Sequence, residues 1–254
     1  MLNWFRRRAG ATPAILPAEW GGVFERNVPY YRLLPPEQQA RLREIAGALI
    51  AEKHWEGCRG FKVTDEMKVT IAGHAACLLL GRNDGHFPRL KTILLYPTMF
   101  VVEDRVHEPD GTVADIEVEH AGQSWDLGVV VLAWDEVVLS ANRGGDTYNV
   151  VLHEFAHQLD AAETSTDGTP PLDDPNLRAR WADVMQRHYD RLDRDVRRGR
   201  QTILDPYGLE APAEFFAVAT ETFFEDPIAL RNHHPELYAL LRDYYKQDPA
   251  ALVA

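Results

Sequence analysis

Hydrophobic residues recur at helical spacing in two segments of the N-terminal third of the chain. The first segment opens at Pro35 and Pro36, and its apolar positions are Leu42, Ile45, Leu49 and Ile50. Proline in the first turn and this spacing are typical of an amphipathic helix. A second helix is predicted over TDEMKVTIAGHAACLLL, residues 64–80, with Thr64 or Asp65 as its N-terminal cap.

Short apolar runs in the middle of the chain favour strands. KTILLYPTMFVV, residues 91–102, is rich in residues that favour β-structure and is predicted to be a buried strand. VADIEVEHAG, residues 113–122, alternates apolar and polar positions, whereas LGVVVLAW, residues 127–134, is nearly all apolar. Both are predicted to be further strands of a small sheet.

Helical segments dominate the second half of the sequence. After two glycines, a long helix is predicted to begin near Thr147. The turn-forming residues of ETSTDGTPPLDDP predict a loop at 163–175, and helices are expected at 176–198, 211–225 and 235–246. These patterns predict an α+β fold that is mainly helical, with a small mixed β-sheet beside the helix near Thr147.

The domain organisation expected from these patterns is simple. Residues 1–18 contain prolines and small residues without periodicity, and we expect them to form a flexible tail. Residues 19–254 show no internal repeat and no clear linker. They are predicted to form a single domain, built as one body or as two lobes with a functional site between them.

Charge and composition exclude several classes of protein. A formal net charge of -12 disfavours direct binding to nucleic acid, and the densest basic run, RLDRDVRRGR at 191–200, is interrupted by aspartates that favour a solvated helix face. Two cysteines are too few for a disulfide framework. The N-terminus lacks the order of a secretory signal, and no apolar run approaches the roughly 18 residues that cross a membrane. A cytoplasmic protein with no membrane partner is therefore expected.

The helix near Thr147 carries the motif with the clearest chemistry. In NVVLHEFAHQLDAAE, residues 149–163, His153 and His157 are four positions apart and so project from one face of a helix. Two imidazoles in this arrangement can bind one Zn²⁺ ion. Glu154, next to the first imidazole, could hold and deprotonate a zinc-bound water instead of binding the metal.

The residues around this motif favour a metal over chance. Apolar side chains cover nearly every other side of the helix, which predicts that it is buried. Three polar or ionisable groups in a buried helix need partners, and a metal ion with its water would satisfy all three. The alternative is a core helix whose histidines form hydrogen bonds to carbonyl groups.

A catalytic zinc site usually takes a third protein ligand from elsewhere in the chain. The next histidine, His188, lies in an Arg-rich helix that is predicted to be exposed, so it is a poor candidate. Glu214 is better, because it follows a proline suited to a helix start and lies among apolar residues. Glu221 lies seven residues later on nearly the same face of that helix and could support the site. The alternative is that Glu214 only stabilises the start of the helix.

Asp160 is a further candidate next to the motif. It follows His157 by three residues, so its carboxylate could orient a ligand imidazole. It could equally cap the loop that follows. Both interpretations stay open at the level of sequence.

Four segments together resemble one known family. LYPTMFVVED, GQSWDLGVVVLAW, NVVLHEFAHQLD and DPYGLEAPAEFFAVATETFF look like the corresponding parts of the MtfA family, the Mlc titration factor A zinc peptidases. The similarity runs from about residue 20 to residue 248. H-E-x-x-H with a downstream helical Glu also resembles the wider gluzincin group of metallopeptidases.

The resemblance implies a fold, a cofactor and residue roles. It implies a gluzincin-like metallopeptidase with one zinc ion per chain, held by His153, His157 and Glu214, and an aminopeptidase-like activity on small peptide substrates. Glu154 would be the general base, and the Tyr207 hydroxyl would stabilise the tetrahedral oxyanion. In some members it also implies binding to a transcriptional repressor of the Mlc type.

Substrate binding and function leave alternatives open. In gluzincins a substrate backbone adds to a strand edge near the metal helix, and VVVLAW or the segment around VVLSAN could supply that edge or form an ordinary core strand. The main alternative function is a regulatory protein that sequesters a transcription factor, with a zinc site that is mainly structural. The presence of Glu154 favours the peptidase, because a structural site needs no general base.

Overall fold

The computed structural model describes Pro17 and residues 20–82, 85–107, 113–120, 122–125, 128–142, 147–162 and 167–253. The predicted flexible tail, residues 1–18, lies outside the described residues apart from Pro17. Whether the chain forms one domain or two lobes therefore stays a prediction, although one continuous hydrophobic cluster contains residues from Val23 to Ala250.

The N-terminal part is helical. It contains α1 (Trp20–Asn27), α2 (Pro29–Leu33), α3 (Pro36–Glu52) and α4 (Asp65–Leu79). The two predicted helices are confirmed as α3 and α4, whereas α1 and α2 were not predicted. The Thr64 hydroxyl accepts a hydrogen bond from the backbone N–H of Met67 at 3.3 Å, so Thr64 is the cap of α4.

A small mixed sheet lies beside these helices. Its strands are β1 (His54–Gly57), β2 (Thr92–Tyr96), β5 (Gly122–Trp125) and β6 (Val129–Ala133), in the order β1-β2-β6-β5. The first three in that order are parallel, and β5 is antiparallel to β6. One face of β2 and β6, with Ile93 and Val130 among its residues, belongs to the main hydrophobic core. The prediction of a small mixed sheet is confirmed.

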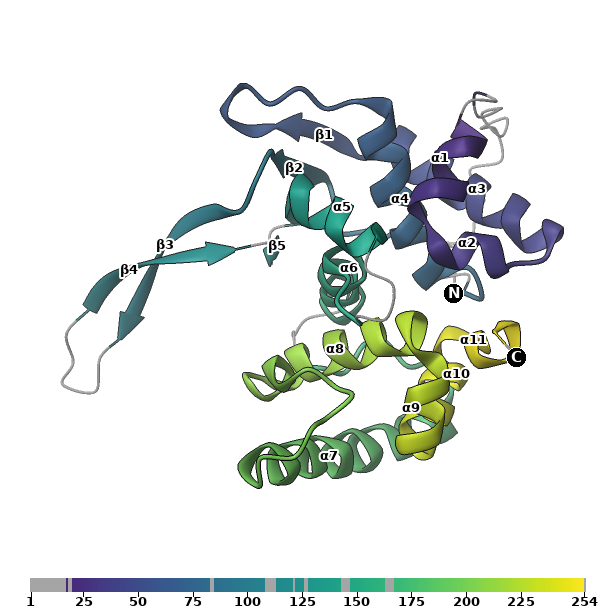
Figure 1. Ribbon diagram of the computed structural model, residues 1–254, viewed down its shortest axis with the longest axis vertical. Helices are drawn as coiled ribbons and strands as arrows, with labels where there is room; N and C mark the ends of the chain where they lie inside the picture. The colour runs from purple at the N-terminus through teal and green to yellow at the C-terminus, as the bar shows by residue number, and fades with distance from the viewer. Residues whose placement is uncertain are drawn as a thin grey trace, which may run out of the picture.

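The predicted strand at 91–102 is two strands. Pro97 follows β2, and β3 (Phe100–His107) begins three residues later. Proline has no N–H for a strand ladder, which accounts for the break. β3 pairs antiparallel with β4 (Val113–His120), and this hairpin projects from the rest of the chain (Figure 1). The strand predicted at 113–122 therefore exists, but the expectation that it belongs to the same small sheet is wrong.

The helix predicted near Thr147 begins slightly later, as α6 (Val150–Asp160), because Asn149 caps it. Before it comes α5 (Trp134–Asn142), which contains VVLSAN. The suggestion that this segment supplies a strand edge is therefore wrong. VVVLAW forms β6, which is paired on both sides, so it is a core strand and no edge.

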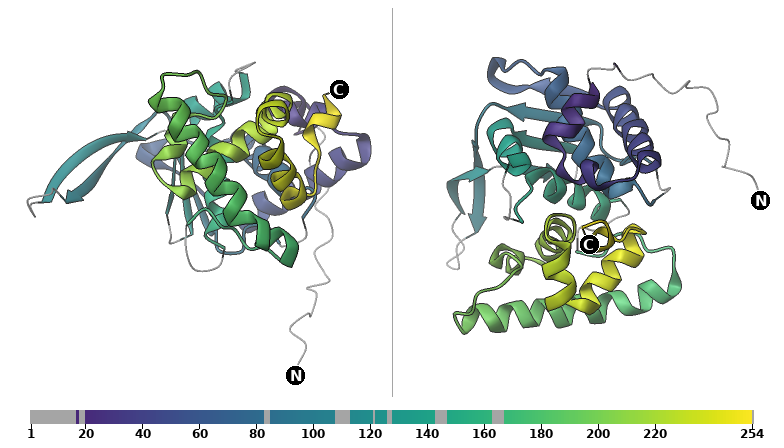
Figure 2. Two further views of the ribbon diagram at one scale, coloured as in Figure 1. Left: turned by 90° about the horizontal axis from the view of Figure 1, so that it is seen from below. Right: turned by 45° about the vertical axis from the view of Figure 1, so that its right-hand side comes forward.

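Most helices of the C-terminal part begin at a proline. They are α7 (Pro175–Arg197), α8 (Pro212–Glu225), α9 (Pro227–His233), α10 (Pro235–Tyr245) and α11 (Pro249–Leu252), with the short 3₁₀ helix η2 (Pro206–Leu209) before α8. The predicted helices at 176–198, 211–225 and 235–246 are confirmed within a residue or two, whereas α9 and α11 were not predicted. In Figures 1 and 2, α8 lies between α6 and α7.

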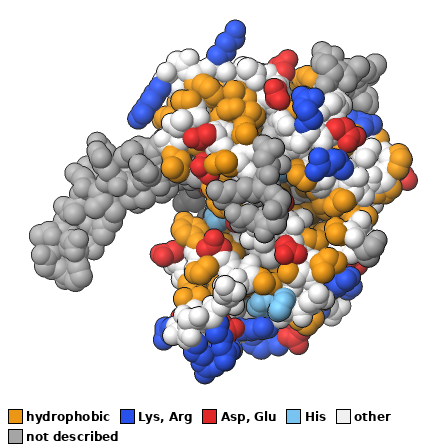
Figure 3. Space-filling model, in the orientation of Figure 1, with side chains coloured by type: hydrophobic (Ala, Val, Ile, Leu, Met, Phe, Trp, Pro, Cys, Tyr) orange, Lys and Arg blue, Asp and Glu red, His pale blue; other side chains and the backbone are white. Residues whose placement is uncertain are grey.

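The basic end of α7 is a solvated surface, as predicted. Lys and Arg side chains gather at the lower left of Figure 3, where α7 ends. Arg197 pairs with Asp193 at 2.8 Å, and Arg200 pairs with Asp195 at 3.0 Å. The expectation that His188 is exposed is wrong: only 7% of this residue is accessible, and its Nδ1 lies 2.8 Å from Nδ1 of His234. Within the described parts of the chain, no helix is long and apolar enough to cross a membrane.

Candidate metal centre

Helix α6 presents the motif residues from a buried position. The Asn149 side-chain oxygen accepts the N–H of Leu152 at 3.1 Å and so starts the helix. Every residue of α6 is buried, and His153, Glu154 and His157 are only 9%, 5% and 8% exposed. The apolar flanks thus bury the helix as the sequence predicts, and its three ionisable groups lie inside the protein.

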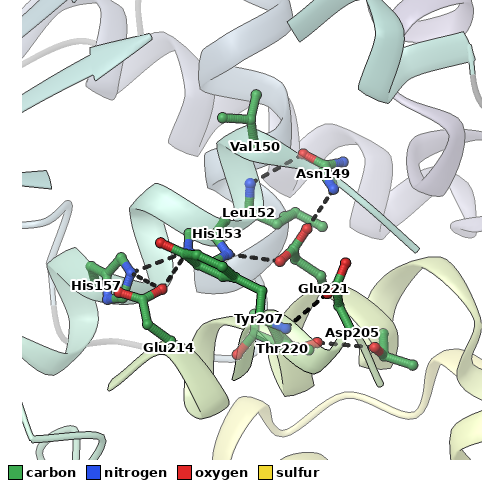
Figure 4. A network of polar contacts seen from close by, with 12 residues as sticks. Asn149, Val150, Leu152, His153, His157, Asp205, Tyr207, Glu214, Thr220 and Glu221 are labelled. Atoms are coloured by element: carbon green, nitrogen blue, oxygen red, sulfur yellow. Dashed lines mark hydrogen bonds and ion pairs between the residues drawn. The ribbon is translucent and has the colours of Figure 1, made fainter. Parts of the chain in front are cut away.

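Helix α8 brings Glu214 to these histidines. Nε2 of His153 and Nε2 of His157 lie 2.9 Å and 3.3 Å from Oε2 of Glu214, and the two imidazole nitrogens are 3.2 Å apart (Figure 4). The three donor atoms all lie within 4.8 Å of one another. Two residues from one helix and one from another therefore converge on a single point.

The donor set and an unsatisfied atom beside it fit a metal ion. Two imidazole nitrogens and one carboxylate oxygen are ordinary zinc ligands. Oε2 of Glu154, the residue next to His153, is buried and has no hydrogen-bond partner among the described residues. Buried polar atoms without partners are costly, so the site is suited to a bound ion and water.

The electrostatics differ for the two glutamates. Burial opposes ionisation of Glu214, yet the hydrogen bonds with His153 and His157 hold its pKa well below the usual range. Burial raises the pKa of Glu154 to about 7, although the two histidines lower it in part. Glu214 is thus a carboxylate suited to binding a cation, and Glu154 is suited to exchanging a proton near neutral pH.

Tyr207 lies at the open side of the site, on η2. Its ring centroid is 5.8 Å from that of His153, and 53% of the residue is exposed. The backbone N–H of Tyr207 donates to Asp205 at 2.9 Å, which holds the start of η2. Burial of the hydroxyl, followed by the charge of Glu214, raises the pKa of Tyr207 to about 12. The hydroxyl therefore keeps its proton and can donate it in a hydrogen bond.

Asp160 and Glu221 have different surroundings. Oδ2 of Asp160 accepts the N–H of Gly168 at 2.8 Å, which is the loop contact that the sequence left open. No hydrogen bond joins Asp160 to either imidazole in the described part of the chain. Oε1 of Glu221 lies 2.7 Å from Nδ1 of His153, so Glu221 holds the imidazole of this candidate ligand.

Sequence reasoning missed three residues behind the site: Asn149, Glu225 and His74. The Asn149 side chain lies 2.6 Å from Oε1 of Glu225 and 3.1 Å from Nδ1 of His74. An asparagine just before an apolar helix is a recognisable cap, so Asn149 could have been found by its position. No sequence pattern indicated the other two.

A buried H-E-x-x-H helix, a second helix that brings a carboxylate to it, and a small mixed sheet beside them are features typical of metallopeptidases. A sequence model of the family described as "Glucose-regulated metallo-peptidase M90" matches residues 1–246. The chain belongs to this metallopeptidase family, together with proteins that bear the name Mlc titration factor A.

Relatives match over nearly their whole length. An uncharacterized protein of Synechocystis sp. is 38% identical, over 98% of this chain and 90% of the relative. Mlc titration factor A of Serratia proteamaculans is 34% identical, over 92% of this chain and 88% of its own. The protein of that name from Pectobacterium atrosepticum is 31% identical, over 89% and 85%.

Proposed function

We propose that the protein is a zinc-dependent peptidase whose single zinc ion is held by His153, His157 and Glu214. The observation that carries this proposal is the convergence of their three donor atoms within 4.8 Å, from two helices. When bound, zinc would supply a Lewis acid that polarises the scissile carbonyl and lowers the pKa of a water molecule. The arrangement of ligands on two helices supports a gluzincin-like site.

Glu154 is the general base in this proposal. It neighbours the first ligand along α6, its Oε2 has no hydrogen-bond partner among the described residues, and its pKa of about 7 suits proton transfer at neutral pH. It would take a proton from the attacking water and give it to the leaving amine. A mainly structural zinc site has no use for such a buried carboxylate, which disfavours the alternative of a pure binding protein.

Tyr207 completes the proposed reaction. Its protonated hydroxyl, close to His153, would donate a hydrogen bond to the oxyanion that develops on the scissile carbonyl. The exposure of Tyr207 supports a site that opens to solvent on this side, where a small peptide or amino-acid amide could enter. Aminopeptidase-like activity in the cytoplasm is the form of the function we propose.

A second partner is suggested by the names of relatives. The proteins from Serratia and Pectobacterium are named as titration factors of Mlc. We infer from these names that a repressor of the Mlc type is a candidate partner of this chain.

The decisive experiment for the peptidase is Glu154→Gln. This substitution keeps the size of the side chain but removes the basic carboxylate, so turnover of a chromogenic amino-acid amide should fall about 10²–10⁴-fold. Zinc content and melting temperature should stay close to those of the parent. Glu44→Gln, which changes an exposed carboxylate on α3, is the matched control and should keep full activity. Full activity in a folded, zinc-loaded Glu154→Gln protein would refute the mechanism.

A further inference from the structure

Asn149 lies at a junction of three helices behind the metal centre. It is fully buried, and its side-chain oxygen is used to cap α6. Its side-chain nitrogen reaches Glu225 on α8 at 2.6 Å and His74 on α4 at 3.1 Å. Its backbone N–H donates to Oε2 of Glu221, also on α8, at 2.6 Å.

The orientation of the Asn149 amide follows from its neighbours. Nε2 of His74 lies 2.8 Å from the carbonyl oxygen of Asn27, so that nitrogen must donate. Burial lowers the pKa of His74 to about 4, so the ring is neutral and its Nδ1 must accept. The Asn149 NH₂ group therefore faces two acceptors, Nδ1 of His74 and the Glu225 carboxylate, while its oxygen faces the N–H of Leu152.

Glu221 connects Asn149 to His153, the proposed metal ligand. One of its carboxylate oxygens accepts from the backbone of Asn149, and the other lies 2.7 Å from Nδ1 of His153 (Figure 4). A carboxylate oxygen in this position accepts, so Nδ1 of His153 carries the proton. With Nδ1 held by Glu221, Nε2 is the nitrogen of His153 that can bind a metal, and it faces Glu214 and His157.

We propose that Asn149 is a positioning residue for the metal centre. It tethers α8 at two successive turns, through Glu221 and Glu225, and thereby keeps His153 in the tautomer that can bind the metal through Nε2. This inference rests on the zinc site proposed above. It assigns a role to a residue that touches no metal ligand with its side chain.

Asn149→Asp is the sharpest test, because it keeps the shape and the capping oxygen of Asn149. The second side-chain oxygen would face the acceptors of His74 and Glu225, so the donors to both would be lost. We expect the zinc dissociation constant to rise by up to about 10-fold, which is less than the 10–100-fold typical of removing a direct partner of a metal ligand, because Glu221 keeps its contact with His153. The measurement is a competition titration of metal-free protein with zinc against a chelating indicator, with circular dichroism to establish folding.

Further variants separate positioning from general stability. Glu225→Gln keeps an oxygen that can accept from Asn149 and should bind zinc like the parent, whereas Glu225→Ala should bind more weakly. Thr220→Val is the matched control: Thr220 is fully buried on the same helix, and its hydroxyl bonds to Tyr245 at 2.8 Å, away from the metal ligands. It should lower the melting temperature without changing the dissociation constant. The visible spectrum of cobalt-loaded protein should change in Asn149→Asp and not in Thr220→Val.

The outcomes are distinct. Parent-like zinc binding in Asn149→Asp, or an equal loss in Thr220→Val, overturns the inference while the zinc site stands. If Asn149→Asp does not fold, Glu221→Gln and Glu225→Ala decide, and parent-like binding in both overturns it. If His157→Ala keeps stoichiometric zinc, the proposed metal site itself is wrong, and the inference fails with it.

Discussion

Burial decides what each side chain of the metal centre can do. Glu154 and Glu214 are both glutamates, yet burial raises the pKa of the first, whereas hydrogen bonds with two histidines lower that of the second. The sequence predicts a proton-transfer role for Glu154 from the H-E-x-x-H spacing, and the proline before Glu214 makes that residue a candidate ligand. It suggests that Glu221 supports the site but cannot say which side chain Glu221 contacts, because Glu221 meets the His153 ring only after two helices have packed together.

The proposed role of the Tyr207 hydroxyl can be tested by removing that hydroxyl alone. Tyr207→Phe removes only a hydroxyl, so we expect kcat for an amino-acid amide to fall about 10–100-fold with little change in KM. The loss should be smaller than that of Glu154→Gln, because the remaining groups of the site still stabilise the oxyanion.

A second tyrosine provides the control for Tyr207→Phe. The Tyr189 hydroxyl donates to the carbonyl oxygen of Leu209, at the end of the same 3₁₀ helix, at 2.8 Å. Tyr189→Phe removes a hydroxyl from the same region without touching the site, and should keep kcat within about threefold. Equal losses in the two variants would show that Tyr207 acts only through the structure of η2.

Among the elements, those with local signals were predictable and those set by tertiary contacts were not. Proline at the first turn and apolar spacing located α3, α7, α8 and α10 within a few residues. VVLSAN, rich in β-favouring residues, is helical in α5, where packing on neighbouring elements outweighs its weak intrinsic preference. The position of α8 against α6, which creates the site, depends on long-range packing that no local pattern encodes.

Gly168 lies where α6, α7 and the start of α8 meet. It has φ +80, its N–H donates to Asp160 at the end of α6, and its carbonyl accepts from the Trp181 indole on α7 at 3.0 Å. A Cβ here would lie 2.4 Å from the carbonyl oxygen of Pro212, at the start of α8. Gly168→Ala should therefore destabilise the protein by about 2–4 kcal/mol and weaken zinc binding, because α8 carries Glu214 two residues later.

Gly199 is the control for this substitution. It has φ +64, but nothing lies within 4 Å of a Cβ built there. Gly199→Ala should lower the free energy of unfolding by only about 1 kcal/mol, because alanine disfavours a left-handed backbone, and the zinc affinity should not change. Denaturant unfolding and zinc titration of both variants measure the difference. Similar behaviour of the two would mean that the contact with Pro212 does not position α8.

At the scale of the whole molecule, the site is an assembly of distant segments. His153 and Glu214 are 61 positions apart, and α7 and η2 lie between them in the sequence. Helix α8 packs against α6 and also against α7, α9 and α10. The stability of those helices against one another limits the conditions under which the site can exist.

A buried histidine pair makes that stability depend on pH. His188 on α7 and His234 before α10 face each other through their Nδ1 atoms at 2.8 Å. Burial lowers the pKa of both, that of His234 to about 4, and Arg191 acts in the same direction. The other charged groups that act on the pair are Arg187, His233, Asp195 and Glu236, and the two acids offset the cations only in part.

The sign of the pH dependence follows from these lowered pKa values. Above pH 6.5 both folded and unfolded histidines are neutral, so the pair has no effect on the free energy of unfolding. Between pH 6.5 and about 4 the unfolded chain binds protons that the folded pair cannot, so stability should fall. We expect His234 to contribute about 1–2 kcal/mol of this loss, after allowance for solvent screening.

The glutamine of His234→Gln cannot titrate, so the unfolding free energy of this variant should fall less steeply over that range. Urea unfolding of the metal-free parent and variant from pH 7.5 to 4 measures the difference between their unfolding free energies. His74 is present in both proteins, so its contribution cancels in that difference. Parallel curves would mean that the pair does not govern the acid sensitivity of the C-terminal helices.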